Sequence, residues 1–480
     1  MMNPAAPLLN APSPALLAAL AARLGPRGYT VDPDAMRPWL TDWRGKFHGA
    51  AAAMLSPAST AEVAAIVALC RDAHVALVPQ GGNSGMVGGA TPDASGTQLL
   101  LSLRRMNRIR MIDSGARAVV AEAGVILEHL HDAAAVHGLR FPLTLGGKGS
   151  ATIGGLVSTN AGGTQVLRHG TMRALVEGVE AVLPDGSVFD GLAPLKKDNR
   201  GYDLKHLLCG AEGTLGVVTA ARLTLVPTIA QRITAWIGVA DPDAALVMLR
   251  RLETDFGAEL EGFELIPQSC VDAVVRHIPG TRAPLPTHTG WQVLVELATD
   301  DAREATRLVE LAATAATDGV IADMLLARSE ADANAWWRIR DAISEAERAS
   351  GPAIQHDVSV PVAAMPRFIA DNPVRLAAAF PGARAISFGH LGDGNVHHHV
   401  QPPVGVDGDA WVARHGEAVS ELVYRHVIEL GGSLSAEHGI GQMKRDVLRR
   451  LSDPARIAVL RGVKSGLDPD GLFNPGKLVP

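Results

Sequence analysis

The stretch VALVPQGGNSGMVGG, residues 75–89, decides the fold of this chain, because it joins a short apolar strand directly to a glycine-rich loop. Five glycines fall within residues 79–89. Residues without side chains allow consecutive backbone N–H groups to point inward and bind an anion such as a pyrophosphate. The glycine spacing fits neither GxGxxG nor GxxxxGK[ST], so it argues against a Rossmann unit and a P-loop.

Two further glycine-rich stretches support a ligand-binding interpretation of the first. They are LGGKGSATIGGLVSTNAGG at residues 145–163 and CGAEGTLGVVT at residues 209–219. A single loop of this kind is more often a tight turn than a ligand site. Three of them in one half of the chain, mixed with small hydroxyl and amide side chains, favour a bound phosphorylated ligand.

The combination of PxGGNSGxxGG, IGGxxSTNAGG, GxEGTLGVVT and a C-terminal FNPGK resembles the FAD-binding domain of the vanillyl-alcohol oxidase and p-cresol methylhydroxylase superfamily. The resemblance runs from about Trp39 to the last residue and implies an FAD cofactor. Some relatives link the flavin to a histidine or cysteine, whereas this loop carries Ser84 and Met86, so we expect non-covalent FAD. The residues implied to bind the cofactor are Pro79, Gly81, Gly82, Asn83, Ser84, Gly85, Ser150, Gly155, Thr159, Asn160, Gly162, Gly213, Val218 and Asn474.

The resemblance and the sequence pattern together predict an α+β fold. It comprises a two-subdomain PCMH-type FAD-binding domain and a cap domain with a large antiparallel sheet and flanking helices, which we expect on one face of that sheet. The predicted parts are an N-terminal helical segment at 1–46, the FAD-binding domain at 47–228, the cap at 229–434 and a C-terminal segment at 435–480 that returns to the FAD-binding domain. Helical periodicity is clear at 61–73, 336–349 and 410–430, and strands are expected at 75–78, 179–183, 216–225 and 291–297.

A dense group of chemically active residues lies in SFGHLGDGNVHHH, residues 387–399, and in SAEHGIG, residues 435–441. His390 and His397 are separated by a glycine-rich turn that can bring two strand ends together. With Glu437 they form a two-histidine, one-carboxylate set suited to Zn²⁺, with Mn²⁺ as the alternative. Adjacent strand residues face opposite sides, so His398 and His399 are interpreted as ordinary polar strand residues.

These two motifs resemble the metal-containing D-2-hydroxyglutarate and D-lactate dehydrogenase branch of the superfamily. The resemblance implies that His390, His397 and Glu437 hold the metal and that His438 is the catalytic base. A metal lowers the pKa of a substrate hydroxyl, so an imidazole can remove its proton while a hydride passes to the flavin.

Recognition of the substrate acid is expected from four further residues. Arg340 and Ser344 lie four apart on one predicted helix and match the positions that bind the acid in this branch. Gln355 stands where relatives commonly carry lysine, and replacing a charge-assisted contact by a neutral amide costs roughly 1.5–3 kcal/mol. That departure weighs against a dicarboxylate substrate. Asn395 is the fourth polar contact.

The amino-acid composition excludes some classes of binding partner. A net charge of −6 with 4% aromatic residues argues against nucleic acid. Cys70, Cys209 and Cys270 form no CxxC pair and are expected to be isolated thiols of a reduced protein. The N-terminal 25 residues carry no basic start, so we expect an amphipathic first helix, no transmembrane segment and a cytoplasmic location. The expected electron acceptor is an electron-transfer flavoprotein or a quinone, and a homodimer is kept open.

Three alternatives remain beside the D-2-hydroxy acid dehydrogenase. The first is the flavin subunit of a glycolate oxidase complex, which would need a separate iron–sulfur partner. The second is a zinc hydrolase with structural glycine loops, which would be colourless. The third is a non-catalytic electron-carrier flavoprotein, which would bind FAD without reduction by a hydroxy acid.

Overall fold

The computed structural model describes residues 9–193, 195 and 197–480, and these form two compact units. The first unit takes Met1–Gly163, Gly170–Thr228 and Glu437–Pro480, and the second takes Thr164–His169 and Ile229–Ala436. Residues 1–8 of the predicted N-terminal helical segment lie outside the described residues. Within the described part, no helix is long and apolar enough to cross a membrane.

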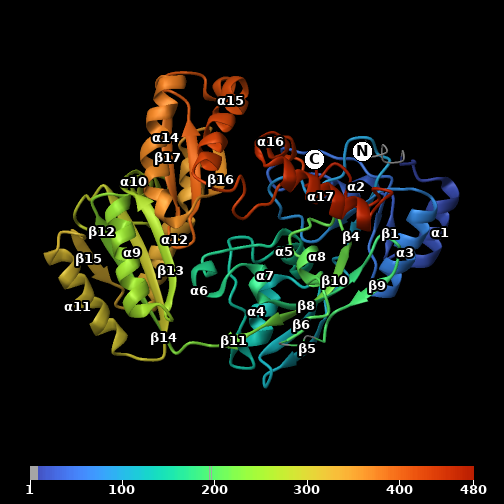
Figure 1. Ribbon diagram of the computed structural model, residues 1–480, viewed down its shortest axis with the longest axis horizontal. Helices are drawn as coiled ribbons and strands as arrows, with labels where there is room; N and C mark the ends of the chain where they lie inside the picture. The colour runs from blue at the N-terminus through green and yellow to red at the C-terminus, as the bar shows by residue number, and fades with distance from the viewer. Residues whose placement is uncertain (1–8, 194, 196) are drawn as a thin grey trace. The chain divides into compact units, whose positions relative to one another are not determined.

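The described residues of the first unit form a four-stranded, a five-stranded and a two-stranded sheet, with helices packed around them (Figure 1). The smaller sheet has the order β1-β2-β4-β3, in which β2, β4 and β3 are parallel. The larger sheet, β5-β6-β10-β8-β9, is antiparallel, and β7 pairs with β11. The strands are β1 (Tyr29–Thr30), β2 (Ala53–Leu55), β3 (Leu77–Gln80), β4 (Leu99–Ser102), β5 (Ile109–Asp113), β6 (Ala118–Glu122), β7 (Leu139–Arg140), β8 (Val176–Val182), β9 (Val188–Asp190), β10 (Val217–Thr224) and β11 (Val226–Pro227). The helices are α1 (Pro14–Leu24), α2 (Pro33–Met36), η1 (Arg37–Trp39), α3 (Thr60–Asp72), α4 (Leu127–Ala135), α5 (Ile153–Thr159), α7 (Met172–Leu175), α8 (Leu204–Leu208), α16 (Arg445–Leu451) and α17 (Pro454–Leu467).

Helix α3 shows why these residues take helical form. Ser59 caps its first turn, since the side chain accepts a hydrogen bond from the Glu62 N–H. The buried residues Val63, Ile66 and Val67 recur at helical spacing, so one face packs into the core of the smaller sheet. The predicted helix at 61–73 is therefore confirmed.

The C-terminal segment packs against the first glycine-rich region of the same unit. Leu77 in β3 forms a bridge with Phe473, and the backbone N–H of Asn474 donates to the Leu77 carbonyl at 2.8 Å. Phe473 is fully buried in the core around β3. Segments almost 400 residues apart in the chain thus lie side by side, as the red and blue ribbons of Figure 1 show.

The second unit is built on one seven-stranded antiparallel sheet with the order β15-β12-β14-β13-β17-β18-β16. The large antiparallel sheet predicted for this region is confirmed. Its strands are β12 (Gln231–Val239), β13 (Leu260–Pro267), β14 (Trp291–Thr299), β15 (Asp323–Leu326), β16 (Ile354–Ser359), β17 (Arg384–His390) and β18 (Asn395–Gln401). Its helices are α6 (Val166–His169), α9 (Pro242–Phe256), α10 (Gln268–His277), α11 (Glu304–Thr317), α12 (Glu330–Asp341), α13 (Ile343–Ala349), η2 (Val362–Ala364), α14 (Met365–Ala379) and α15 (Gly408–Glu429).

Helices cover both faces of this sheet, so the expectation of helices on one face was wrong. One face packs its Trp236, Ile266 and Phe388 side chains against α10, α12 and α13. On the other face, α9 contacts α14, α14 contacts α15, and Phe368 of α14 meets the ring of His398. The central strands are apolar on both sides; every residue of β13 is buried, for example. Such strands need cover on both faces.

The helix predicted over 336–349 is interrupted. Helix α12 ends at Asp341, Ala342 caps it, and α13 begins at Ile343. Ile339, Ile343 and Ala346 all face the core, so the apolar periodicity continues across the interruption and hides it from the sequence pattern.

Candidate functional site

The loop after β3 exposes a run of unused backbone donors. In the described part of the chain, the N–H groups of residues 82–86 form no hydrogen bond with a protein acceptor. Gly85 is exposed, and a Cβ placed there would meet nothing within 4 Å. A row of such donors beside open space suits the oxygens of a pyrophosphate. This geometry fits the FAD cofactor implied by the sequence.

The first and second glycine-rich stretches contact one another. A Cβ at Gly81 would collide with the Thr152 hydroxyl, and one at Gly82 would collide with the Ser150 carbonyl oxygen. Both approaches are closer than side-chain carbons tolerate, so these two positions require glycine. The structure therefore brings Gly81, Gly82 and Ser150 together, and their contact with FAD stays a prediction.

Glu212 lies in the third glycine-rich stretch, and its contacts connect segments of the first unit that are distant in the chain. Its carboxylate accepts the backbone N–H groups of Ile440 and Gly441, each at 2.7 Å. Its carbonyl accepts the Asn474 amide at 2.7 Å, and the same amide donates to the Gly89 carbonyl at 2.8 Å. Burial raises the pKa of Glu212, although the two backbone donors act in the opposite direction. Sequence reasoning missed Glu212, whose only signal was an acid inside the glycine-rich stretch 209–219.

The side chains of several predicted cofactor residues are used within the protein. Asn83 donates to the Thr41 carbonyl at 2.9 Å, Thr159 donates to the Gly155 carbonyl at 2.9 Å, and Asn160 accepts the Arg173 N–H at 2.9 Å. Val218 is buried in the core of the larger sheet. Asn83 and Asn160 also adopt left-handed backbone conformations, with φ near 50°. These side chains shape the loops, and their contact with FAD stays a prediction.

The remaining cofactor positions lie on the same loops. Gly213, with φ 69°, packs against the Pro79 ring, and a Cβ there would come within 3.2 Å of it. Ser84 is half-buried, Gly155 lies within α5, and Gly162 follows the left-handed residue Asn160 that ends this helix.

In the second unit, the hairpin of β17 and β18 places the first two predicted metal ligands. His390 ends β17, while His397 lies in β18 opposite Phe388. The turn between them depends on glycine: Gly389 has φ 146°, and a Cβ there would come within 2.5 Å of the Asn395 carbonyl oxygen. Gly394, with φ 80°, would collide with the Val360 carbonyl. The two imidazole rings meet edge to face, with centroids 5.5 Å apart.

His390, His397 and Glu437 each offer a ligand atom, and these atoms lie within 4.8 Å of one another. Glu437 directly follows Ala436, and Ser433, four residues earlier, forms two backbone hydrogen bonds with Ser359 of β16. Burial, Arg340 and His390 hold the pKa of His397 well below its usual range. A neutral imidazole is the form that binds metal. The donor set therefore fits a divalent cation such as Zn²⁺.

Arg340 and His390 share a buried carboxylate that sequence reasoning missed. Glu264 in β13 accepts the Arg340 Nε at 2.7 Å and the His390 Nδ1 at 2.5 Å. The Arg340 Nη2 also lies 3.2 Å from the His390 Nε2. Burial raises the pKa of Glu264, but Arg340 and His390 together lower it to about 2. The available signal was one acid within the apolar strand GFELI.

The other three predicted substrate-binding residues differ in how deeply they are buried. Ser344 lies in the first turn of α13 and is exposed. Gln355 is half-buried and pairs with His399 across β16 and β18. Asn395 is buried, and its amide nitrogen donates to Asp357 and to the Val358 carbonyl. Substrate contact by these three stays a prediction.

The histidines beside His397 face opposite sides of the sheet, as expected. His399 packs on Phe388 together with His397 and hydrogen-bonds the buried Glu347. His398 points to the other face, where it meets the Ser387 hydroxyl at 2.8 Å.

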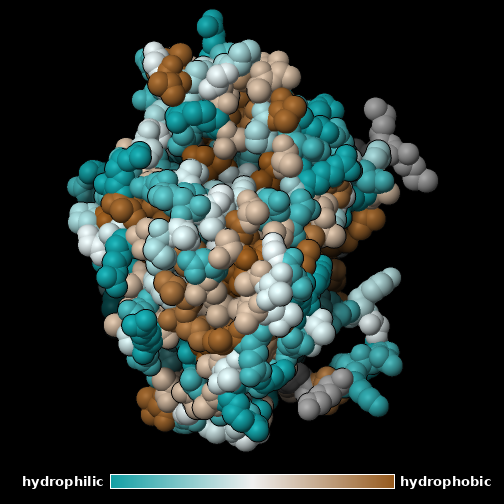
Figure 2. Space-filling view, turned by 90° about the vertical axis from the view of Figure 1, so that its left-hand side faces the viewer, coloured by the Kyte–Doolittle hydropathy of each residue, from teal (hydrophilic) through white to brown (hydrophobic). Residues whose placement is uncertain are grey.

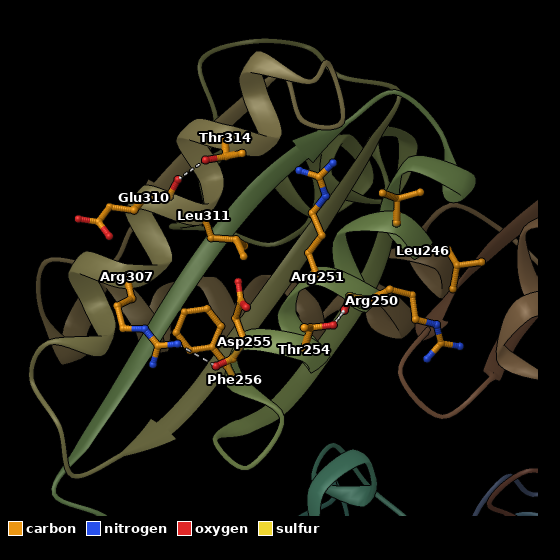
Figure 3. Close-up of a pocket in the computed structure, with 11 residues that line it drawn as sticks. Leu246, Arg250, Arg251, Thr254, Asp255, Phe256, Arg307, Glu310, Leu311 and Thr314 are labelled. Carbon is orange, nitrogen blue, oxygen red and sulfur yellow. Dashed lines mark hydrogen bonds between the residues drawn. The ribbon is translucent and has the colours of Figure 1, made fainter.

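A hollow of the second unit lies elsewhere, between α9 and α11 (Figure 3). It measures about 880 Å³ and contains none of the predicted site residues. Its arginines are paired with acids: Arg250 with Glu253, Arg251 with Asp318 and Arg307 with Glu304. The face shown in Figure 2 also carries apolar side chains in its middle, surrounded by polar ones. Exposed apolar surface of this kind is ordinary, so we place the site by its chemistry.

Comparison with known proteins gives two family matches. Residues 229–478 match the family described as FAD linked oxidases, C-terminal domain, and residues 51–191 match the family described as FAD binding domain. The D-2-hydroxyglutarate dehydrogenase of Bos taurus is 36% identical over 97% of this chain and 83% of its own length. The protein of that name from Xanthomonas citri pv. viticola is 34% identical over 93% of each chain.

Solved structures agree on the fold. p-Cresol methylhydroxylase superposes with a TM-score of 0.75 at 14% identity, covering 96% of each chain. An alkyldihydroxyacetonephosphate synthase gives 0.73 at 15% identity, covering 99% of this chain and 88% of the other. The predicted PCMH-type α+β fold is confirmed.

The cytoplasmic location expected from the N-terminal sequence is contradicted. The relatives from Bos taurus and from Arabidopsis thaliana, the latter 34% identical over 95% of this chain, are both named mitochondrial. The expectation rested on the absence of a basic start typical of secretory signals, and that pattern is uninformative about organelles reached by other routes. We therefore withdraw it.

Proposed function

Because this chain belongs to the family of FAD-linked oxidases and is an oxidoreductase acting on CH–OH donors, we propose that it oxidises a D-2-hydroxy acid to the 2-oxo acid. The first candidate substrate is D-2-hydroxyglutarate, the acid in the names of these relatives, and D-lactate is the alternative. Bound FAD supplies the hydride acceptor.

The observation that carries this proposal is the position of Arg340 beside the histidine pair. A 2-hydroxy acid carries its carboxylate and its hydroxyl on neighbouring carbons, so its binding site needs a cation close to a group that activates the hydroxyl. The guanidinium of Arg340 lies 3.2 Å from His390, whose ring contacts that of His397. An Arg fork can hold the carboxylate while the imidazoles hold a divalent metal next to it.

Each of the proposed site residues has its own role in the proposed reaction. Arg340 would orient the carboxylate, and His390, His397 and Glu437 would hold a divalent metal, which would supply a Lewis acid for the hydroxyl. His438, the residue after Glu437, takes the hydroxyl proton. The backbone of Ile440 and Gly441, fixed by Glu212, holds the segment that carries this histidine.

The cofactor is proposed to be bound non-covalently. The backbone donors at residues 82–86 support this proposal, and the loop contains no histidine or cysteine to which a flavin could be linked. We expect acid precipitation to release the flavin into the supernatant; flavin that remained in the pellet would contradict this part of the proposal.

An anaerobic titration of the purified protein tests the reaction itself. The flavin band is followed while D- and L-lactate, D- and L-2-hydroxyglutarate and D-malate are added separately. We expect one D-acid to bleach the band and its L-enantiomer to leave it unchanged. A flavin that no acid bleaches would overturn the proposed reaction. Bleaching without a partner protein also separates this proposal from a flavin subunit that depends on an iron–sulfur partner.

Metal removal tests the second half of the mechanism. We expect that chelation removes flavin reduction by the acid and that Zn²⁺ or Mn²⁺ restores it, because the hydroxyl then regains its Lewis acid. FAD content, measured before and after chelation, serves as the control. Full activity after metal removal has been verified by elemental analysis would eliminate the metal from the mechanism.

A further inference from the structure

Glu264 has an unusual set of partners for a buried carboxylate. Its side chain is 1% exposed, and its two oxygens contact side chains from two other elements, His390 of β17 and Arg340 of α12. The contact with His390 is fixed by the strand pairing, since Glu264 lies directly opposite His390 in the sheet. One carboxylate thus joins a proposed metal ligand to the proposed binder of the substrate acid.

The contact to His390 determines which ring nitrogen can hold a metal. Because Glu264 accepts at Nδ1, that nitrogen carries the hydrogen and Nε2 carries the lone pair. A carboxylate behind a ligating imidazole also orients the ring and raises its basicity toward the metal. In the present structure the Nε2 lies 3.2 Å from the Arg340 Nη2.

The contact to Arg340 fixes the orientation of the guanidinium. Its Nε donates to Glu264 at 2.7 Å, and the planar group lies over the Phe388 ring at 5.8 Å from its centroid. Two positive groups, the guanidinium and a metal ion, would repel one another at this separation. The negative charge of Glu264, which contacts both Arg340 and His390, offsets that repulsion.

The same face of the sheet offers a carboxylate for comparison. Glu296 in β14 is 5% exposed, and it accepts the Trp337 Nε1 of α12 at 2.7 Å and an Arg232 Nη at 2.5 Å. It therefore also attaches α12 to the sheet, but it does so through Trp337, and its ion pair is with Arg232 rather than with Arg340. A purely structural role for Glu264 would make the two carboxylates equivalent.

We propose that Glu264 is a positioning residue that sets the His390 tautomer for metal binding and aims Arg340 at the substrate carboxylate. This inference rests on the proposed function. It adds a residue that couples the affinity for the metal to the affinity for the acid.

The test compares Glu264→Gln with Glu296→Gln in the full-length FAD-loaded protein. Zn²⁺ affinity is measured on metal-free protein by competition with a colorimetric chelator, and KM and kcat are measured separately for the best acid. We expect Glu264→Gln to weaken Zn²⁺ binding about 10–100-fold, the usual effect of losing such a partner, and to raise KM. We expect Glu296→Gln to keep the wild-type Zn²⁺ affinity and KM, even where its thermal stability falls.

If Glu264→Gln does not fold, Glu264→Asp replaces it, because the shorter acid keeps the charge but cannot reach both partners at once. Wild-type Zn²⁺ affinity and KM in the folded variant would overturn the inference, provided that His390→Ala loses the metal. If His390→Ala itself binds Zn²⁺ as the wild type does, the metal site of the proposed function fails, and this inference fails with it.

Discussion

At the scale of single residues, buried carboxylates organise both units. Glu212 holds the backbone of Ile440 and Gly441, and Glu264 holds Arg340 and His390. Both acids are nearly inaccessible to solvent, at 9% and 1% exposed. A carboxylate without partners in such a place would be costly, so both are surrounded by donors. The donors to Glu264 belong to proposed site residues, and the donors to Glu212 follow the proposed base His438 closely in the chain.

The role of His438 can be tested by one substitution. We expect His438→Ala to keep its FAD. The rate at which the acid reduces the flavin should fall at least ~10²-fold, which is the usual effect of losing a general base. Stopped-flow absorbance under anaerobic conditions measures this rate. His137→Ala, which changes an exposed histidine of the same unit, is the control. Near-normal reduction by His438→Ala would remove this residue from its role.

Substrate preference is expected to depend on Gln355. This residue lies opposite His399 in the sheet, on the strand face that also carries His397, so a longer ammonium side chain at position 355 would lie on the side of the proposed metal ligands. A charge-assisted hydrogen bond contributes roughly 1.5–3 kcal/mol. We therefore expect Gln355→Lys to raise the ratio of kcat/KM for D-2-hydroxyglutarate over D-lactate by about 10-fold or more.

The neutral variant Gln355→Met separates the effect of charge from that of shape. It should leave the ratio near its wild-type value or lower it. An unchanged ratio in Gln355→Lys would show that this side chain does not reach the tail of the substrate.

At the scale of elements, close-packed glycine-rich loops shape the first unit, and one glycine-dependent hairpin shapes the second. The loop after β3 packs on the stretch before α5 through Gly81 and Gly82, and the turn between β17 and β18 depends on Gly389 and Gly394. The strands supply the rigid part: β13, β17 and β18 fix Glu264, His390 and His397 by register. Rigid elements hold reactive groups more accurately than loops do.

Close packing of the first two glycine-rich stretches predicts the effect of one methyl group. We expect Gly82→Ala to lower the thermal unfolding midpoint and the FAD content, because its Cβ would overlap the Ser150 carbonyl oxygen. Gly462→Ala in α17 is the matched control, since a Cβ there meets nothing within 4 Å. Alanine inside a helix stabilises by roughly 0.5–1 kcal/mol relative to glycine. Equal unfolding midpoints and flavin content in the two variants would contradict the packing.

At the scale of the whole molecule, the C-terminal segment makes stability depend on pH. Lys477 is 3% exposed, and burial lowers its pKa to about 8, with Asp93 acting against the shift and Arg445 acting with it. The unfolded chain keeps this proton up to the ordinary lysine pKa of 10.5. Between these values the unfolded state binds more protons, so stability contributed by this group rises with pH.

Thermal unfolding of the wild type and of Lys477→Met at pH 7.5 and at pH 9.5 checks this contribution. Other lysines, tyrosines and cysteines titrate in the same range, so the measured quantity is the difference between the two proteins. We expect the wild type to gain stability relative to Lys477→Met as the pH rises. A difference that stays constant with pH would show that Lys477 has an ordinary pKa in the folded protein.

Features that depend on a local pattern can be predicted from the amino-acid sequence alone. The strand and glycine loop at 75–89 and the histidine spacing at 390–397 place backbone donors and two imidazoles through short-range geometry, because strands alternate and glycine permits tight turns. The FAD-linked family and the α+β fold follow from the same motifs. The helix interruption at Ala342 stayed hidden, since the apolar spacing continues through it.

Which carboxylates support the proposed site residues depends on tertiary packing. Glu264 and His390 are 126 positions apart, and their contact depends on the register of β13 against β17. Glu212 meets Gly441 across 229 positions, and residues 164–169 pack with the second unit although the chain around them belongs to the first. Pairings of this kind are set by how whole elements pack, because no local periodicity records which residues of two distant strands will lie opposite one another.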